Sequence, residues 1–223
     1  MKDLVDTLRG NVTMADFKYA FAKLIKNEGG YVDDPSDSGG ETYMGVSRNN
    51  YPEWEGWEII DSYKPSASFP SILYFDRNLH NMVFIFYKKN YWDKIKGDLI
   101  PDTTIAHELL DSAVNLGIKT VSKFFQRGIN LLNYKNTVGK KVVKKFKDLE
   151  IDGKIGDVTI KAYNSLSLFE KQILYTILNI MQGSYYIYIA EKYPKNKRFL
   201  KGWLSRRLNL DEMEICYEEQ GII

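Results

Sequence analysis

The sequence predicts a mainly α-helical protein, and three observations support this prediction. Apolar residues recur three and four positions apart through most of the chain, which places them on one face of a helix. No alternating pattern outweighs this helical spacing, although the residues around Val46 fit a small β-hairpin. No repeat of solenoid length is present. With 223 residues, of which 44% are hydrophobic, the chain is long enough for one sizeable core or two small lobes.

The first predicted helix begins at a capping signal and carries a carboxylate at its far end. Residues 13–16, Thr-Met-Ala-Asp, have the form of a capping box. The face that follows comprises Phe17, Phe21, Leu24 and Glu28. Desolvation and the negative end of the helix dipole are both expected to raise the pKa of Glu28, which suits a general acid. Judged from the helix face alone, a glutamate that turns into water is the more frequent case.

A loop rich in glycine and acidic residues follows this helix, and a loop shaped by glycine often carries a site. Asp37 lies nine positions after Glu28, and Thr42 lies five positions after Asp37. A glycosidase needs one carboxyl to protonate the leaving oxygen and a second to activate water or stabilise positive charge. A threonine hydroxyl can orient that water. Asp37 is equally well explained as a turn residue that bonds its own backbone. The competing second carboxylates are Asp33, Asp34 and Glu41.

Three motifs in this region resemble the N-acetylmuramidases of glycoside hydrolase family 108, which include phage-type endolysins and proteins once called secretion activators. They are Glu-Gly-Gly-Tyr at 28–31, Asp-Pro-x-Asp-x-Gly-Gly-x-Thr at 34–42 and Gly-Val-Ser at 45–47. The resemblance implies a lysozyme-like helical fold with Glu28 as the catalytic acid. The spacing is also similar to that of phage lysozymes, where the gap from Asp to Thr is one residue longer. This departure weakens the assignment of Thr42 more than that of Glu28.

The resemblance also implies a reaction, which is hydrolysis of the β-1,4 bond between N-acetylmuramic acid and N-acetylglucosamine in peptidoglycan. Asp37 is preferred over Asp34 and Glu41 as the second carboxylate, and Tyr31 and Tyr43 are expected to contact the substrate. The reaction requires no metal and no organic cofactor. The sequence leaves open whether the mechanism is inverting or retaining, because that depends on the distance between the carboxyl groups.

An aromatic turn and two predicted helices follow the loop. Trp54 and Trp57 can line a saccharide groove or cap the core under a loop, and the sequence favours neither reading. A connector at 58–75 contains Pro65 and Pro70 and is expected to begin with a short helix at 58–63. Residues 76–96 have helical spacing, and Gly97 fits a C-cap.

The middle of the chain predicts two further helices, at 101–117 and 120–132. Asp111 and Asn115 lie one turn apart and share a face. They can bind substrate hydroxyls or fix a neighbouring helix, and the structural role is favoured. The one basic cluster of the chain fits a solvated helix face better than a nucleic-acid or anionic-polymer site, because its single interleaved aromatic residue, Phe146, fits the apolar stripe with Val142 and Val143. Its members are Lys140, Lys141, Lys144, Lys145 and Lys147.

The last third of the chain begins with Asp-Gly-x-Ile-Gly at 152–156, a tight turn before a helix. Together with the segment around Asp111 and Asn115, it resembles the peptidoglycan-binding-like segment of the same family. The pattern is short, so no binding residues are assigned from it. Residues 168–192 predict one long helix that is buried within the protein rather than in a membrane, because its uncharged run contains many polar residues. The sequence therefore predicts a muramidase catalytic region at 1–98 and a helical peptidoglycan-binding-like region at 99–223, packed into one compact unit.

Composition excludes several classes of protein. The formal net charge of +2 gives no reason to expect a nucleic-acid partner. A single cysteine, Cys216, excludes an intrachain disulfide and argues against a zinc cluster, and His80 and His107 lack ligand spacing. The first residues lack an apolar run, so no signal peptide is expected. A cytoplasmic bacteriolytic enzyme would then reach the cell wall through a holin or a non-standard export route. The sequence does not indicate an oligomeric state.

Two other functions fit the same motifs. A lytic transglycosylase would share the fold and the substrate, but it needs only the acid and yields anhydro sugars. A non-catalytic wall-binding or secretion-accessory protein would bind peptidoglycan without releasing reducing ends. The presence of Glu28 next to an intact glycine-rich loop favours the hydrolase.

Overall fold

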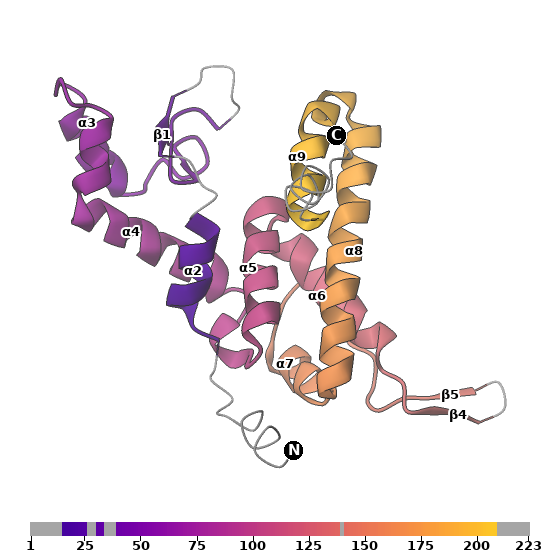
Figure 1. Ribbon diagram of the computed structural model, residues 1–223. Helices are drawn as coiled ribbons and strands as arrows, with labels where there is room; N and C mark the ends of the chain where they lie inside the picture. The colour runs from indigo at the N-terminus through magenta and orange to yellow at the C-terminus, as the bar shows by residue number, and fades with distance from the viewer. Residues whose placement is uncertain (1–14, 26–29, 34–38, 139–140, 209–223) are drawn as a thin grey trace, which may run out of the picture. The chain divides into compact units, whose positions relative to one another are not determined.

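The computed structural model describes residues 15–25, 30–33, 39–138 and 141–208, and these form a mainly helical protein with two small antiparallel sheets (Figure 1). The predicted fold class is therefore confirmed. The contacts divide the chain into two compact units, Met1–Ile118 and Lys119–Ile223. The sequence-based assignment of two functional regions that divide between residues 98 and 99 stays a prediction.

Four α-helices and three shorter helical segments build the described part of the first unit. They are α2 (Phe17–Ile25), α3 (Gly56–Tyr63), η1 (Ser71–Phe75), α4 (Arg77–Tyr87), the π-helical η2 (Lys88–Trp92), η3 (Gly97–Leu99) and α5 (Thr103–Leu116). The predicted helices at 58–63 and 101–117 are thus present. The side chain of Asp102 caps α5 by accepting hydrogen bonds from the backbone N–H of Thr104 and Ile105, at 2.9 and 3.1 Å.

The α2 helix buries the face that its spacing predicts. Phe17, Ala20 and Leu24 are buried, and the ring of Phe17 lies 5.3 Å from the ring of Trp92 between centroids. The Asp16 carboxylate accepts a hydrogen bond of 2.8 Å from the backbone N–H of Lys18 and so caps the first turn. Thr13, the residue expected to begin the capping box, lies outside the described residues.

The prediction that Gly97 caps the helix at 76–96 is wrong. The left-handed residue is Lys96, at φ +58°, and Gly97 instead begins η3. Gly97 is required by packing, because a Cβ built there would lie 2.2 Å from the ring of Trp92. The helix also changes from α to π hydrogen bonding at Lys88, and Trp92, the last residue of the π-helical segment, is fully buried.

The described part of the second unit contains four α-helices, a hairpin and a short 3₁₀ segment. They are α6 (Ile118–Leu131), β4 (Asn136–Val138), β5 (Lys141–Val143), α7 (Asp157–Asn164), α8 (Leu168–Lys192), η4 (Pro194–Asn196) and α9 (Lys197–Leu208). The long helix predicted at 168–192 is present, and a capping box of Ser167 and Glu170 starts it. The prediction that this helix is buried is wrong, because only one face of it is buried and apolar residues such as Phe169 and Ile180 are exposed. Figure 1 shows α8 and α9 side by side, and the rings of Tyr186 and Trp203 stack between them at 5.0 Å.

Within the described helices, α8 included, none combines the length and the apolar character that a membrane span requires.

The prediction that the basic cluster lies on a helix face is also wrong. Lys141 lies in β5, which pairs with β4 in an antiparallel hairpin that extends from the helices of its unit (Figure 1). The chain after the hairpin stays non-helical because the Asn133 side chain binds its backbone. The amide oxygen of Asn133 accepts hydrogen bonds from the backbone N–H of Lys145 and Phe146, at 2.9 and 3.0 Å. A side chain that binds extended backbone in this way competes with helix formation.

Candidate functional site

A three-stranded antiparallel sheet forms the centre of the candidate site. It consists of β1 (Tyr31–Val32), β2 (Thr42–Tyr43) and β3 (Val46–Ser47), in that order, and confirms the hairpin expected around Val46. Met44 and Gly45 connect β2 to β3 with φ values of +44° and +80°. Two positive φ values favour the twist of a tight hairpin, but they strain a side chain such as that of methionine. The Tyr87 hydroxyl donates a hydrogen bond of 3.0 Å to the Met44 carbonyl and helps to hold this turn.

A pocket of about 910 Å³ lies beside this sheet. Its walls come from the last turns of α2, the first two strands, η1 and the start of α4. The residues that line it are Ala22, Ile25, Gly30, Tyr31, Tyr43, Met44, Pro70, Ser71, Leu73, Tyr74, Phe75, Arg77 and His80. This volume is within the range of small-molecule sites, and several of the side chains that line the pocket are aromatic. The pocket can therefore hold a segment of an extended ligand.

A network of charges fixes the strands on one side of the pocket. The Glu41 carboxylate accepts hydrogen bonds from the Tyr31 hydroxyl and from Lys64, both at 2.9 Å, and also pairs with Arg48. Arg48 pairs in turn with both carboxylate oxygens of Asp61. Glu41 is only 9% exposed, so its negative charge is stabilised mainly by these partners.

The network sets the protonation states of two of its members. Burial raises the pKa of Glu41, but hydrogen bonds from Lys64, Tyr31 and Arg48 outweigh burial and lower it below its ordinary value. Burial raises the pKa of Tyr31 to about 12, and the hydrogen bond to Glu41 acts in the same direction. Near neutral pH Glu41 is therefore an anion and Tyr31 a neutral donor. These contacts favour a structural role for Glu41 over proton transfer.

The proposed catalytic residues are described only in part. Glu28, Asp34 and Asp37 lie outside the described residues, so their roles stay predictions. Thr42 lies in β2, is half-buried, and donates a hydrogen bond of 3.2 Å to the Gly40 carbonyl at the end of the acidic loop. Asp33 directly follows β1 and is exposed.

Both tyrosines that sequence assigned to the substrate line the pocket. Tyr31 and its neighbour Gly30 both line it. Tyr43 is 2% exposed, and its hydroxyl donates a hydrogen bond of 3.3 Å to the Leu73 carbonyl. Tyr43 thus forms part of the wall and also part of the core. Burial raises the pKa of Tyr43 to about 12, so its hydroxyl is neutral near neutral pH.

The structure does not bring the other assigned binding residues to this pocket. Trp57 is buried and donates from Nε1 to the Tyr51 carbonyl at 2.9 Å, while Trp54 lines a separate hollow of about 340 Å³ with Tyr51. Asp111 and Asn115 share a face of α5, as expected, and the Asn115 amide donates to the Asp111 carbonyl at 2.8 Å. None of these residues is among those that line the 910 Å³ pocket, and their role in sugar binding stays a prediction.

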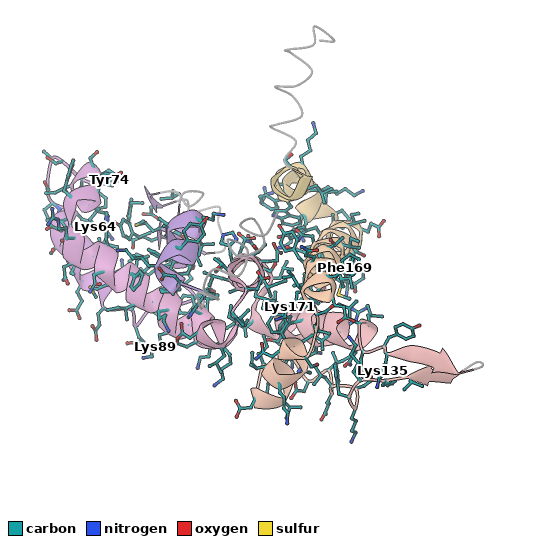
Figure 2. All side chains as sticks on the ribbon, turned by 60° about the horizontal axis from the view of Figure 1, so that its bottom comes forward. Lys64, Tyr74, Lys89, Lys135, Phe169 and Lys171 are labelled. Carbon is teal, nitrogen blue, oxygen red and sulfur yellow. The ribbon has the colours of Figure 1, made fainter. Side chains whose placement is uncertain are left out.

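Sequence reasoning missed most of the residues that line the pocket, and two of those missed are exposed aromatics. Tyr74 and Phe75 are 76% and 79% exposed, and Figure 2 labels Tyr74 on the first unit. Arg77 and His80, from the start of α4, were also missed. The Nε2 atom of His80 is buried and has no hydrogen-bond partner among the residues that the structure describes. Two adjacent aromatic residues in a proline-containing connector were the available signal.

Comparison with known families defines the class of protein to which this fold and pocket belong. A sequence model of the family described as Glycosyl hydrolase 108 matches residues 21–117, which include the sheet and every residue that lines the pocket. The first unit is therefore that of a glycosidase. A second model, described as a predicted peptidoglycan domain, matches residues 121–208 of the second unit. The chain thus carries a glycosyl hydrolase family 108 domain followed by a peptidoglycan-domain segment, and this pair of domains supports a peptidoglycan hydrolase function.

The fold is also similar to a solved structure. The structure of SagA from Brucella abortus superimposes with a TM-score of 0.58 and 22% sequence identity, over 90% of this chain and 94% of that chain. At this identity the likeness shows the shared fold. The comparison with curated proteins finds no match.

Proposed function

We propose that the protein is an N-acetylmuramidase that hydrolyses the β-1,4 bond between N-acetylmuramic acid and N-acetylglucosamine, with Glu28 as the general acid. The observation that carries this proposal is the course of the chain around the pocket. Ile25 and Gly30, the nearest described residues on either side of Glu28, both line the pocket. The short stretch of chain that contains Glu28 therefore begins and ends at residues that line the pocket.

We assign the second carboxylate to Asp37. The described chain on either side of Asp37 is anchored to the sheet, because β1 pairs with β2 and the Gly39 carbonyl accepts a hydrogen bond of 2.7 Å from the Ser47 hydroxyl. These anchors hold both ends of the acidic loop at the sheet that borders the pocket. In the proposed reaction Glu28 protonates the leaving oxygen, and Asp37 positions water or stabilises the oxocarbenium-like transition state. Thr42 shapes the end of the loop.

The network around Glu41 supports this division of roles. Glu41 is held as an anion by two cations, so it does not compete with Glu28 as the acid. It instead orients the Tyr31 hydroxyl at the pocket edge. Two alternative functions remain, a lytic transglycosylase and a non-catalytic wall-binding protein. They differ from the hydrolase in the chain ends that they produce from peptidoglycan, because the first yields anhydro sugars and the second yields no new ends.

The test is to identify the sugar at each new chain end. We expect digestion of purified peptidoglycan, followed by borohydride reduction and mass spectrometry, to show reduced N-acetylmuramic acid. Anhydro ends would support the transglycosylase, and reduced N-acetylglucosamine would assign the other glycosidic bond. Binding to the polymer with no new ends would support the wall-binding protein.

We further propose that the enzyme is bacteriolytic, as in the endolysin members of its family, and that it reaches the wall from the cytoplasm through a holin or a non-standard export route. In this proposal the pocket binds a segment of the glycan, and the reaction requires no metal and no organic cofactor. The loss of turbidity of a cell suspension shows whether the protein is bacteriolytic. The same measurement with and without a co-expressed holin shows whether it needs that route to the wall.

We expect the exposed aromatic pair at the pocket to contribute to substrate binding. Changing Tyr74 and Phe75 together to alanine should raise KM for soluble glycan chains about tenfold, which corresponds to about 1.4 kcal/mol, because partial burial of two rings under sugar C–H faces is lost. Both side chains are more than three-quarters exposed, so the melting temperature should not change. Steady-state kinetics measure the effect.

Tyr19→Ala is the matched control for this pair. Tyr19 is an aromatic residue of the same unit, 50% exposed, and it does not line the pocket. Its replacement should leave KM unchanged. An unchanged KM in the Tyr74/Phe75 variant would remove the aromatic pair from the substrate site.

A further inference from the structure

The second unit carries a groove of its own, with a volume of about 400 Å³. It lies between α6, the turn before α7 and one side chain of α8. The residues that line it are Lys119, Thr120, Lys123, Phe124, Arg127, Ile151 and Tyr185. All of them belong to the second unit, so the groove is complete within that unit. The sequence assigned no role to any of them beyond packing.

One wall of the groove is positively charged. Lys119, Lys123 and Arg127 follow one another at intervals of four residues along α6, which places them on one face of the helix. Among the ion pairs of the described residues, none involves any of these three side chains. Their charges are therefore available to an anion in the groove. Three like charges along one face also repel one another, and a bound anion relieves that repulsion.

The opposite wall is held in place by a buried glutamine. The Gln126 amide donates hydrogen bonds of 2.7 Å to the Asp152 carboxylate and 2.9 Å to the Lys154 carbonyl, and its oxygen accepts one of 3.0 Å from the Gly153 N–H. Gly153 has φ +80°, and a Cβ there would lie 2.9 Å from the Lys119 carbonyl. The Asp-Gly turn is thus built to approach α6 closely, and this approach brings Ile151 to the groove.

The remaining surface of the groove is apolar and aromatic. Ile151 is 44% exposed, and the rings of Phe124 and Tyr185 meet edge to face at 5.9 Å between centroids. A ligand that fits this groove therefore combines negative charge with small apolar groups.

We propose that this groove binds the peptide stem of peptidoglycan, with its carboxylates on Lys119, Lys123 and Arg127 and its alanine methyl groups against Ile151 and Tyr185. The proposal rests on the proposed function, because it takes the same polymer as the substrate. It adds a second contact, to the peptide rather than to the glycan. The second unit would then hold the enzyme on wall that still carries its stems.

The chemistry of the lining favours a peptide stem over the other polymers. Neutral sugar hydroxyls are commonly bound by carboxylate and amide side chains, and the residues that line the groove include three cations and no carboxylate. A nucleic acid or a teichoic acid would present phosphates, and its backbone would require a longer basic track than three residues on one helix. The stem offers several carboxylates and methyl groups within one short peptide.

The first test compares two charge-removal variants of the full chain for binding to intact sacculi, in the cold and for times too short for digestion. The groove variant changes Lys119, Lys123 and Arg127 to Gln, which keeps most of each aliphatic stem. The control variant removes three exposed lysines of the same unit that do not line the groove, Lys135, Lys147 and Lys161. We expect Kd to rise at least tenfold in the groove variant and less than twofold in the control. Equal Kd values for the two variants would overturn the proposal.

The second test uses the parent protein alone and so does not depend on how the variants fold. Sacculi stripped of their stems by an amidase should bind at least tenfold more weakly than intact sacculi. A free L-Ala-γ-D-Glu-diaminopimelate-D-Ala tetrapeptide should displace the protein from intact sacculi. Displacement by inorganic polyphosphate but not by the tetrapeptide would assign the groove to a phosphate polymer instead.

Release of reducing ends from both preparations separates the two proposals. If the parent releases none from either preparation, the proposed glycosidase activity fails, whatever the binding result. If it releases them from both while stem removal leaves Kd unchanged, the groove proposal alone fails.

Discussion

Replacing Glu28 with Gln is expected to lower the rate of reducing-end release from peptidoglycan by about 10²–10⁴-fold, the usual contribution of a general acid. Glutamine has nearly the shape of glutamic acid but cannot give a proton to the leaving oxygen. Binding should persist, because the pocket walls described above are unchanged and the second unit is not affected. The measurement is the initial rate of release from purified sacculi, at equal concentrations of folded parent and variant.

Glu58→Gln is the matched control for this substitution. Glu58 is an exposed glutamate of α3 in the same unit, and it is not among the residues that line the pocket. Its replacement should change the rate by less than twofold. Equal release by the parent and by Glu28→Gln would remove Glu28 from the mechanism and with it the central proposal.

The second large effect is expected for Trp92→Ala, which should destabilise the first unit by about 3–5 kcal/mol. Trp92 is fully buried, packs against Phe17 of α2, and donates from Nε1 to the Asp98 carboxylate at 2.6 Å. Its loss leaves a large cavity under the helix that precedes Glu28. Scanning calorimetry should show the transition of this unit at least about 6 °C lower.

Phe75→Ala provides the contrast, since it removes an aromatic ring that is 79% exposed. Its effect on stability should stay within about 0.5 kcal/mol, as for other surface substitutions. A similar fall in melting temperature for both variants would mean that Trp92 does not carry the packing of α2 described here.

The helices were the most predictable part of the fold, because their signals are local. The capping residues Asp102 and Ser167 and the run of apolar residues at helical spacing start and define α5 and α8 without information from the rest of the chain. The β4–β5 hairpin was missed because its signal is not local. The Asn133 side chain keeps the lysine-rich stretch after the hairpin from forming a helix, and it lies twelve or more positions away from the backbone that it binds.

The residues of the candidate site were predictable only where the family motif itself contains a residue that lines the pocket. Tyr31 and Tyr43 follow directly from the motif, and both line the pocket. The partners of Glu41 are Arg48 and Lys64, seven and twenty-three positions later in the chain, and no sequence period links them. The exposure of Tyr74 likewise depends on how η1 packs, which the proline-containing connector does not specify.

The way in which the acidic loop is closed at its base has a consequence for how this enzyme can change. Val32 pairs with Thr42, and the Tyr31–Glu41 hydrogen bond fastens the same two chain segments together. The entropic cost of closing a chain segment rises by only about 0.6 kcal/mol for each doubling of its length. Insertions between residues 33 and 39 that keep Asp37 are therefore expected to leave the sheet in place. Divergence in wall preference can accumulate in this loop without a new fold, and a library of loop variants is the natural starting point for redirecting the enzyme to other walls.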